Sequence, residues 1–163
     1  MREFGRHSPV ANTSGPKEAL SGNLKDFFSR YESAFTSSNV GAIAKVFADM
    51  CLITTPEEVL LVRNDNELRT ILNGISSRYR AIGVRSVKIA SFTEIELDPY
   101  HALAKVQWSL HRNDGTEIVS FDVTYLVRMT EDGPEIILLI PHSEEERLRE
   151  KGLFAPSRGA GSP

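Results

Sequence analysis

Apolar residues recur at two different spacings along the chain, and the change of spacing separates a helical first half from a stranded second half. Over residues 24–35 and 68–82 the apolar positions return at helical spacing, which predicts two helices with one buried face each. A short helix is expected between them over residues 40–47. Residues 68–82 predict the longest helix, opened by Asn64 or Asp65 and closed by Gly83.

From residue 84 onward the period becomes two, which is the period of a strand with one buried face. It predicts strands over residues 84–97, 100–112 and 116–129. The continuous apolar run 136–140 predicts a central strand covered on both faces. A short hairpin over residues 51–63, interrupted at Pro56, precedes the helix over 68–82, and a final helix follows a capping box that begins at Ser143. This order is typical of an α+β protein.

The first tight turn fixes which side chains share a face of the predicted sheet. Asp114-Gly115 is a strong two-residue hairpin signal, and a loop at that position puts Trp108 opposite Phe121. A one-residue slip would move every side chain of one strand to the other face. The apolar sets of residues 100–112 and 116–129 are therefore expected on one face.

The same reasoning applied to Asp132-Gly133 extends that face to the last strand. A two-residue loop there puts Ile140 opposite Tyr125 and brings His142 beside Val123. Tyr125 and His142 are then the polar groups at the far end of an apolar wall.

The two ends of the chain differ in composition from the rest. Residues 1–20 and 154–163 are polar, rich in Gly, Ser and Pro, and without periodicity. Such segments bury too little apolar area to offset their ordering entropy, so we expect a flexible N-terminal arm and a flexible tail. Residues 21–153 are the predicted single domain.

Composition excludes several classes of protein. Among 163 residues, 40% are hydrophobic, 25% are charged, and the formal net charge is -3, which argues against nucleic-acid or membrane-surface partners. The single Cys excludes an intramolecular disulfide framework. No metal-binding spacing and no Gly-rich phosphate loop is present, so we expect no metal and no cofactor. The first residues lack the apolar stretch of a secretory signal, which predicts a cytoplasmic protein.

Two stretches of the sequence resemble a known superfamily. LKDFFSRYESAFTSSNVGAIAKVFADMCLITTP and the later VTYLVRMTEDGPEIILLIPHSEEE are similar to nuclear transport factor 2-like proteins, most of all to the SnoaL-like and ketosteroid-isomerase-like branch. The resemblance covers about residues 22–150. It implies a cone-shaped, curved antiparallel sheet wrapped around the helices (a cystatin-like α+β roll), an internal pocket and frequently a homodimer.

The resemblance also implies roles for particular residues. Tyr31 matches the first-helix tyrosine that serves ketosteroid isomerases as an oxyanion donor, and Tyr125 matches their second donor position. His142 occupies the place of a pocket-lining aromatic residue. The position of the catalytic aspartate holds Thr55, which cannot shuttle protons as a carboxylate does.

These observations leave open two principal functions and a weaker third. The first is a pocket for a small apolar or aromatic molecule, without an assigned reaction. The second is an isomerase, cyclase or dehydratase in which His142 is the general base and Tyr31 and Tyr125 polarise a carbonyl. The third is a protein-interaction domain that dimerises through the outer sheet face bearing Leu103 and Gln107. The residues expected to contact a ligand are Tyr31, Thr55, Trp108, Phe121, Tyr125 and His142.

Overall fold

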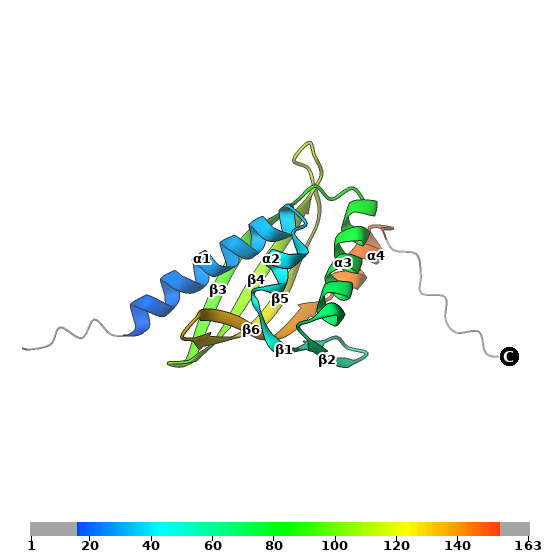
Figure 1. The fold of residues 1–163 in the computed structure, drawn as a ribbon. Helices are drawn as coiled ribbons and strands as arrows, with labels where there is room; N and C mark the ends of the chain where they lie inside the picture. Colours follow the sequence, from blue (N-terminus) through cyan, green and yellow to red (C-terminus); the bar gives the residue numbers. More distant parts are fainter. Residues whose placement is uncertain (1–15, 154–163) are drawn as a thin grey trace, which may run out of the picture.

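A curved sheet with helices against one of its faces makes up the computed structural model, which describes residues 16–153 (Figure 1). Within these residues six strands form one sheet in the order β2-β1-β6-β5-β4-β3. The α+β class and the cystatin-like curved sheet are thereby confirmed. The helices are α1 (Pro16–Thr36), α2 (Val40–Ala44), α3 (Asn66–Ala81) and α4 (Glu144–Glu150). The strands are β1 (Phe47–Thr54), β2 (Val59–Arg63), β3 (Ser86–Asp98), β4 (His101–His111), β5 (Glu117–Thr130) and β6 (Gly133–His142).

Strand pairing is antiparallel everywhere in the described sheet except between β1 and β6, which run parallel. Leu52 of β1 pairs with Leu138 of β6 in that ladder. No hairpin joins these two strands, so their direction is not constrained by a turn. β6 lies between β1 and β5, inside the sheet, as its continuous apolar run predicts. The expectation that it is covered on both faces is wrong, because Ile136 is its one fully buried residue.

Helix boundaries follow local capping chemistry. Asp65 caps α3 by accepting the backbone N–H of Glu67 at 2.8 Å, and Asn39 caps α2 by accepting that of Ala42 at 3.0 Å. Gly83, with φ of 92°, follows the end of α3, where a left-handed conformation favours glycine. Asp65 and Gly83 are among the caps expected from the sequence.

Helix α1 differs from the expectation in its length. It begins at Pro16, inside the segment 1–20 that the sequence predicts as a flexible arm, and its 21 residues exceed the 16 of α3. Proline is favoured at the first helical position because its fixed φ suits the helix and its missing N–H has no partner to lose there. The remaining expectations for residues 1–15 and 154–163 lie outside the described residues.

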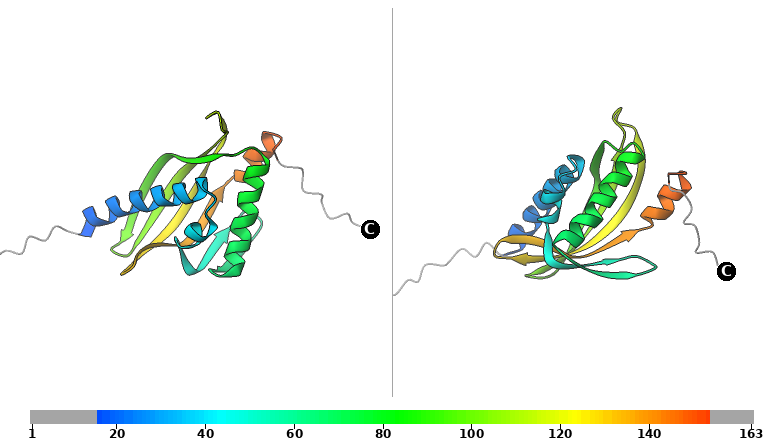
Figure 2. Two further views of the ribbon diagram at one scale, coloured as in Figure 1. Left: turned by 45° about the horizontal axis from the view of Figure 1, so that its top comes forward. Right: turned by 45° about the vertical axis from the view of Figure 1, so that its right-hand side comes forward.

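Two polar side chains near the C-terminal end of α1 attach it to β3. Thr36 Oγ1 donates to the Val87 carbonyl and accepts the Val87 N–H, both at 3.0 Å. Glu32 accepts the backbone N–H of Ile89 at 2.7 Å, next to the point where the β3–β4 register shifts. The same face of the sheet also carries α3 (Figure 2).

The hydrophobic core lies between α1, α3 and one face of the sheet. Alternate residues of β4 and β5 point into it, as their period of two predicts, and Trp108 pairs with Phe121 as expected. Phe28 of α1 is fully buried against Phe92 and Tyr125, with ring centroids 5.5 and 5.0 Å apart.

The expected two-residue loop at Asp114-Gly115 is wrong, however. The Arg112 N–H donates to the Thr116 carbonyl across a three-residue loop, and a bulge at Ile118 restores the register.

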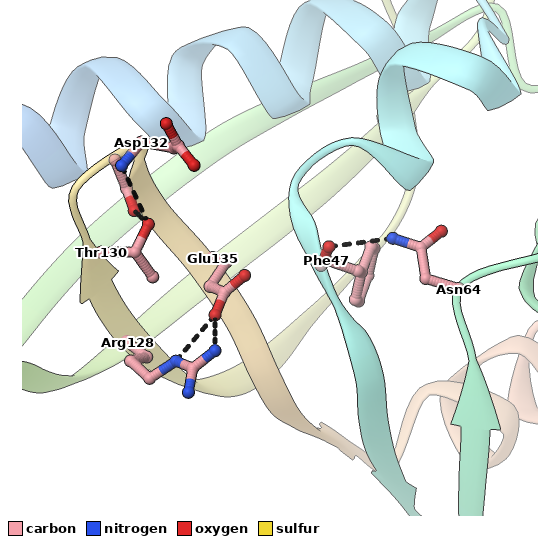
Figure 3. Close-up of polar contacts among 7 residues, drawn as sticks. Phe47, Asn64, Arg128, Thr130, Asp132 and Glu135 are labelled. Atoms are coloured by element: carbon pink, nitrogen blue, oxygen red, sulfur yellow. Dashed lines mark hydrogen bonds and ion pairs between the residues drawn. The ribbon is translucent and has the colours of Figure 1, made fainter.

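The turn between β5 and β6 departs from the expected register. Its tip is formed by Glu131 and Asp132, and Thr130 pairs with Gly133 (Figure 3). Thr130 Oγ1 accepts the Asp132 N–H at 3.2 Å and donates to the Gly133 carbonyl at 2.9 Å. Beyond this turn the paired Arg128 and Glu135 form an ion pair across the two strands (Figure 3).

A β-bulge then shifts the β5–β6 ladder by one residue. Val127 pairs with Ile136, but the next pair is Leu126 with Leu138, so Ile137 is the extra residue. The turn displaces the ladder by two residues from the expected register and the bulge returns one of them, so Tyr125 pairs with Leu139, whereas the sequence predicts Ile140. The expected register of β6 is therefore wrong by one residue beyond the bulge.

The face of the sheet away from the helices carries a row of apolar residues that crosses every strand of the sheet described above. Neighbours in this row are register partners, one from each strand. We call it the outer row. Its members, from β2 to β3, are Leu61, Leu52, Leu138, Leu126, Leu103 and Ile95.

Candidate functional site

A cavity of about 590 Å³ lies between α3 and the face of the sheet that carries the helices. Residues of α1, α3, β4, β5 and β6 form its walls, while the loop after β1 and the first turn of α4 contribute further lining residues. Most of the lining is apolar, and seven aromatic side chains contribute to it. They are Tyr31, Phe35, Phe47, Tyr79, Trp108, Phe121 and Tyr125.

Three aromatic residues with polar tips meet at one wall of this cavity. Tyr31 lies edge-on to Trp108 and to Tyr125, with ring centroids 5.6 and 6.0 Å apart. Trp108 Nε1 donates a hydrogen bond of 2.9 Å to the hydroxyl of Tyr125. All three are at most 4% exposed, so their rotamers are fixed by packing.

Burial keeps both phenols of this cluster protonated. It raises the pKa of Tyr31 well above its ordinary value, and the neighbouring Tyr125 hydroxyl raises it further. Burial also raises the pKa of Tyr125, although the hydrogen bond from Trp108 acts in the opposite direction. Since the Tyr125 oxygen accepts the Trp108 N–H, its own O–H is a donor that can serve a ligand.

A carboxyl group of α4 joins the cavity wall at a second place. The Tyr79 hydroxyl donates to Glu144 Oε1 at 2.5 Å, linking α3 to α4. Burial raises the pKa of Glu144 above its ordinary value of 4.5, while the bond from Tyr79 and the charge of Arg78 lower it. The Glu144 carboxylate in turn raises the pKa of Tyr79, after the larger effect of burial.

Sequence reasoning missed both members of this pair. Tyr79 is part of the apolar stripe of the helix, and Glu144 reads as the second residue of a capping box. The box does not form, because Ser143 has a positive φ of 55° and its side chain makes no capping bond. One feature of the sequence points to Glu144: the first helical turn after a strand that lines the cavity must lie near the cavity mouth.

Two further expected residues line the cavity. Phe121 contributes its ring beside Trp108, its register partner. Thr55 lies in the loop after β1, where its Oγ1 accepts the backbone N–H groups of Glu57 and Glu58 at 3.3 and 3.2 Å. Their contact with a ligand, like that of Tyr31, Trp108 and Tyr125, stays a prediction.

The expected placement of His142 is wrong. Because the β5–β6 turn and the bulge in β6 together shift the register by one residue, His142 pairs with Asp122 instead of lying beside Val123, so it faces away from the cavity. It is exposed, and its Nε2 lies 2.8 Å from Thr124 Oγ1 on the outer face. Pro141 and Leu139 line the cavity in its place. His142 is therefore not positioned to act as a general base there.

The remaining candidate residues form no metal site. Within residues 16–153 no group of three or more His, Cys, Asp or Glu side chains is arranged to hold a metal ion. Cys51 is buried, and burial raises the pKa of its thiol, so it packs as a small core residue. None of the helices described here is long and apolar enough to cross a membrane.

A comparison with protein families gives one assignment. A family model described as "NTF2-like protein (DUF6841)" matches residues 18–144. No curated protein matches the chain.

Solved structures with the same architecture have low sequence identity to this chain. An NTF2-like protein with a cystatin-like fold from Novosphingobium aromaticivorans is 12% identical with a TM-score of 0.65, covering 85% of this chain and 91% of its own. Aln2 from a Streptomyces species is 12% identical with a TM-score of 0.63, covering 81% and 96%. A candidate scytalone dehydratase from N. aromaticivorans is 10% identical with a TM-score of 0.61, covering 78% and 85%. At such identities these likenesses show the fold alone.

Proposed function

The chain belongs to the NTF2-like family DUF6841, and from this premise we propose that its cavity binds a small, mostly apolar organic molecule, aromatic or alicyclic, that carries an acceptor oxygen. One observation carries the proposal: the convergence of Tyr31, Trp108 and Tyr125 on one wall of a mostly apolar cavity. Concave, mainly apolar pockets with a few convergent polar groups are the usual form of small-molecule sites.

The size and chemistry of the cavity indicate how such a ligand would be held. Its volume of about 590 Å³ falls within the range of small-molecule sites. Burial of apolar ligand surface supplies affinity, at roughly 25 cal/mol per Å² before the costs of association. The Tyr125 O–H supplies orientation, because it donates to an acceptor oxygen from a water-poor wall where an unpaired ligand oxygen would be penalised.

A ligand screen with a matched pair of variants tests the proposal. Neutral aromatic and alicyclic ketones, phenols and lactones are screened for a rise in Tm, since a molecule that binds only the native state must stabilise it. For the compounds that bind, Tyr125→Phe is expected to weaken binding by about tenfold, as expected for the loss of one buried hydrogen bond. Tyr100→Phe is the control, because Tyr100 is 65% exposed and outside the cavity lining. A screen in which no such compound raises Tm would reject the proposal.

The enzymatic alternative with His142 as general base loses its geometric support. Its base faces the outer surface, whereas its two tyrosine donors line the cavity. Any acid–base chemistry in this cavity must come from another group.

A further inference from the structure

The pair formed by Glu144 and Tyr79 has no role in the binding proposed above. Both residues line the cavity, and they reach it from different elements, α4 and α3. A carboxyl group taken out of water is costly unless it is hydrogen-bonded, and the Tyr79 hydroxyl supplies such a bond to Glu144.

The carboxyl group is fixed in place from both sides. Tyr79 holds Oε1 at 2.5 Å. Helix α4 is attached to the body by Leu148, which is fully buried, and by Arg147, whose Nη1 donates to the Ser120 carbonyl at 3.1 Å. A side chain held in this way is pre-organised for contact with a bound molecule.

The charges around Glu144 act in both directions. From α3, Arg78 lowers its pKa; from α4 itself, Glu145 raises it, and Glu146 and Arg149 also border the cavity. The phenols that face it from α3, α1 and β5 are Tyr79, Tyr31 and Tyr125, whose own pKa values its charge raises. Burial is the largest effect and raises the pKa of Glu144. A carboxylate with a raised pKa is a stronger base than one in water.

We propose that Glu144, positioned by Tyr79, is the acid–base residue of the cavity, and that its substrates are neutral carbon acids, that is, molecules with a C–H bond acidified by an adjacent electron-withdrawing group. This inference rests on the proposed function, because the substrate must first occupy the cavity. The proposed base lies on α4, whereas the position of the catalytic aspartate in ketosteroid isomerases, held here by Thr55, follows β1.

The step balances without a further reactant. Glu144 Oε2 takes the proton as the C–H bond breaks, and the electron pair of that bond stays in the substrate. The new O–H bond then gives the proton back to another atom of the same molecule or to water, which restores the carboxylate. No oxidant or reductant is required.

The probe 5-nitrobenzisoxazole tests this inference independently of the natural substrate. It is a neutral, bicyclic carbon acid, and removal of its one acidic C–H proton forms a nitrile as the N–O bond breaks and a coloured phenolate is released. We expect the full chain to catalyse this reaction and Glu144→Gln to lower kcat/KM by about 100-fold or more, the range for loss of a general base. Gln keeps an acceptor for Tyr79 and thus preserves the fold. Glu150→Gln, on the same helix but outside the lining, is expected to retain the activity.

Tyr79→Phe separates positioning from a purely structural role. The hydrogen bond from Tyr79 lowers the pKa of Glu144, so its removal should move the acidic limb of the pH–rate profile to higher pH. A structural role alone would change the amount of folded protein and leave that midpoint where it is. Glu144→Asp, a shorter carboxylate, should restore part of the rate lost in Glu144→Gln.

Binding of the probe is measured separately, by its effect on Tm and on the fluorescence of Trp108. A probe that binds but is not turned over, or a Glu144→Gln variant as active as wild type, overturns the role of Glu144 and leaves the proposed function standing. If neither the probe nor any screened compound binds, both proposals are rejected.

Discussion

Single residues of the cavity wall serve the fold as well as a ligand, and Tyr125 illustrates this overlap. Its hydroxyl accepts the N–H of Trp108, a buried side chain that is 4% exposed. A buried donor without a partner costs free energy comparable to its desolvation. Any change at Tyr125 therefore acts on stability before it acts on binding.

Replacing Tyr125 by Phe should lower the free energy of unfolding by about 1–3 kcal/mol, because the Trp108 N–H is left buried and unpaired. Chemical denaturation measures the change. Trp108→Phe in the Tyr125→Phe background removes the unpaired donor. The double variant should therefore lose less unfolding free energy than the two single variants lose together. Strict additivity would show that the two groups are not coupled.

The raised pKa of Glu144 makes stability depend on pH in a definite direction. Because the folded-state pKa lies above the unfolded value, the folded protein retains a proton that the unfolded chain has already released at intermediate pH. The stabilisation of the folded state by this retained proton is complete below the ordinary pKa of 4.5. It is lost as the pH rises through the pKa that Glu144 has in the folded protein.

Glu144→Gln removes this titration, so its Tm relative to wild type should rise as pH is raised from about 4 to about 8. Thermal scans of both proteins across that range check the prediction. Glu150→Gln is the control, since Glu150 is exposed on the same helix. A constant difference in Tm between Glu144→Gln and wild type would contradict it.

At the scale of elements, the sequence predicts structure well where polar residues mark a face and poorly where they do not. Residues 100–112 and 116–129 alternate, so a slip would bury polar groups, and the expected pairing of Trp108 with Phe121 is confirmed. The run 136–140 is apolar at every position, so a one-residue bulge there buries no polar side chain. Its register is set by β1 and β5 on either side, which local sequence cannot reveal.

The residues of the candidate site are predicted well or poorly for the same reason. The cavity residues of β4 and β5 follow from alternation. The expected placement of His142 is extrapolated from an assumed loop at Asp132-Gly133, and it is wrong because the turn and the bulge change that register. Position indicates only that the first turn after β6 lies near the cavity mouth. Which of its side chains enters the cavity depends on the path of the chain after β6, where Ser143 adopts a left-handed conformation.

His142→Ala should leave ligand affinity unchanged and alter the free energy of unfolding by no more than about 0.5 kcal/mol, as is usual for exposed positions. Titration with any compound that passes the ligand screen, together with chemical denaturation, checks both parts. A loss of affinity comparable to that of Tyr125→Phe would mean that β6 adopts the register expected from the sequence.

At the scale of the whole molecule, the helices described here cover one face of the sheet and leave the outer row on the other (Figure 2). Leu61 and Ile95 at its two ends are each 58% exposed. Charged pairs flank the row on both sides: Arg128 with Glu135, and Lys105 with Asp122. An apolar centre with a polar rim is typical of protein–protein interfaces.

We therefore expect a homodimer formed through this face. Light scattering at micromolar concentration should give twice the chain mass of 18.1 kDa. Leu138→Lys, at the middle of the row, should yield monomers because it places a charge at the centre of the interface. Glu131→Lys, at the β5–β6 turn, is the control for an added positive charge. A monomeric wild-type chain would contradict the expectation.

The parallel ladder between β1 and β6 bears on the order in which the molecule assembles. Successive tight turns connect β3 to β6, whereas Phe47 must find Ile136 across most of the chain. Closing so long a loop is entropically expensive until the partner surface exists, so the meander should acquire amide protection first and β1 last. Pulsed hydrogen exchange during refolding would show this sequence of events, and simultaneous protection of β1 and β4 would refute it. A newly made chain would then be able to hold a metabolite only after its earliest strand has joined its final one.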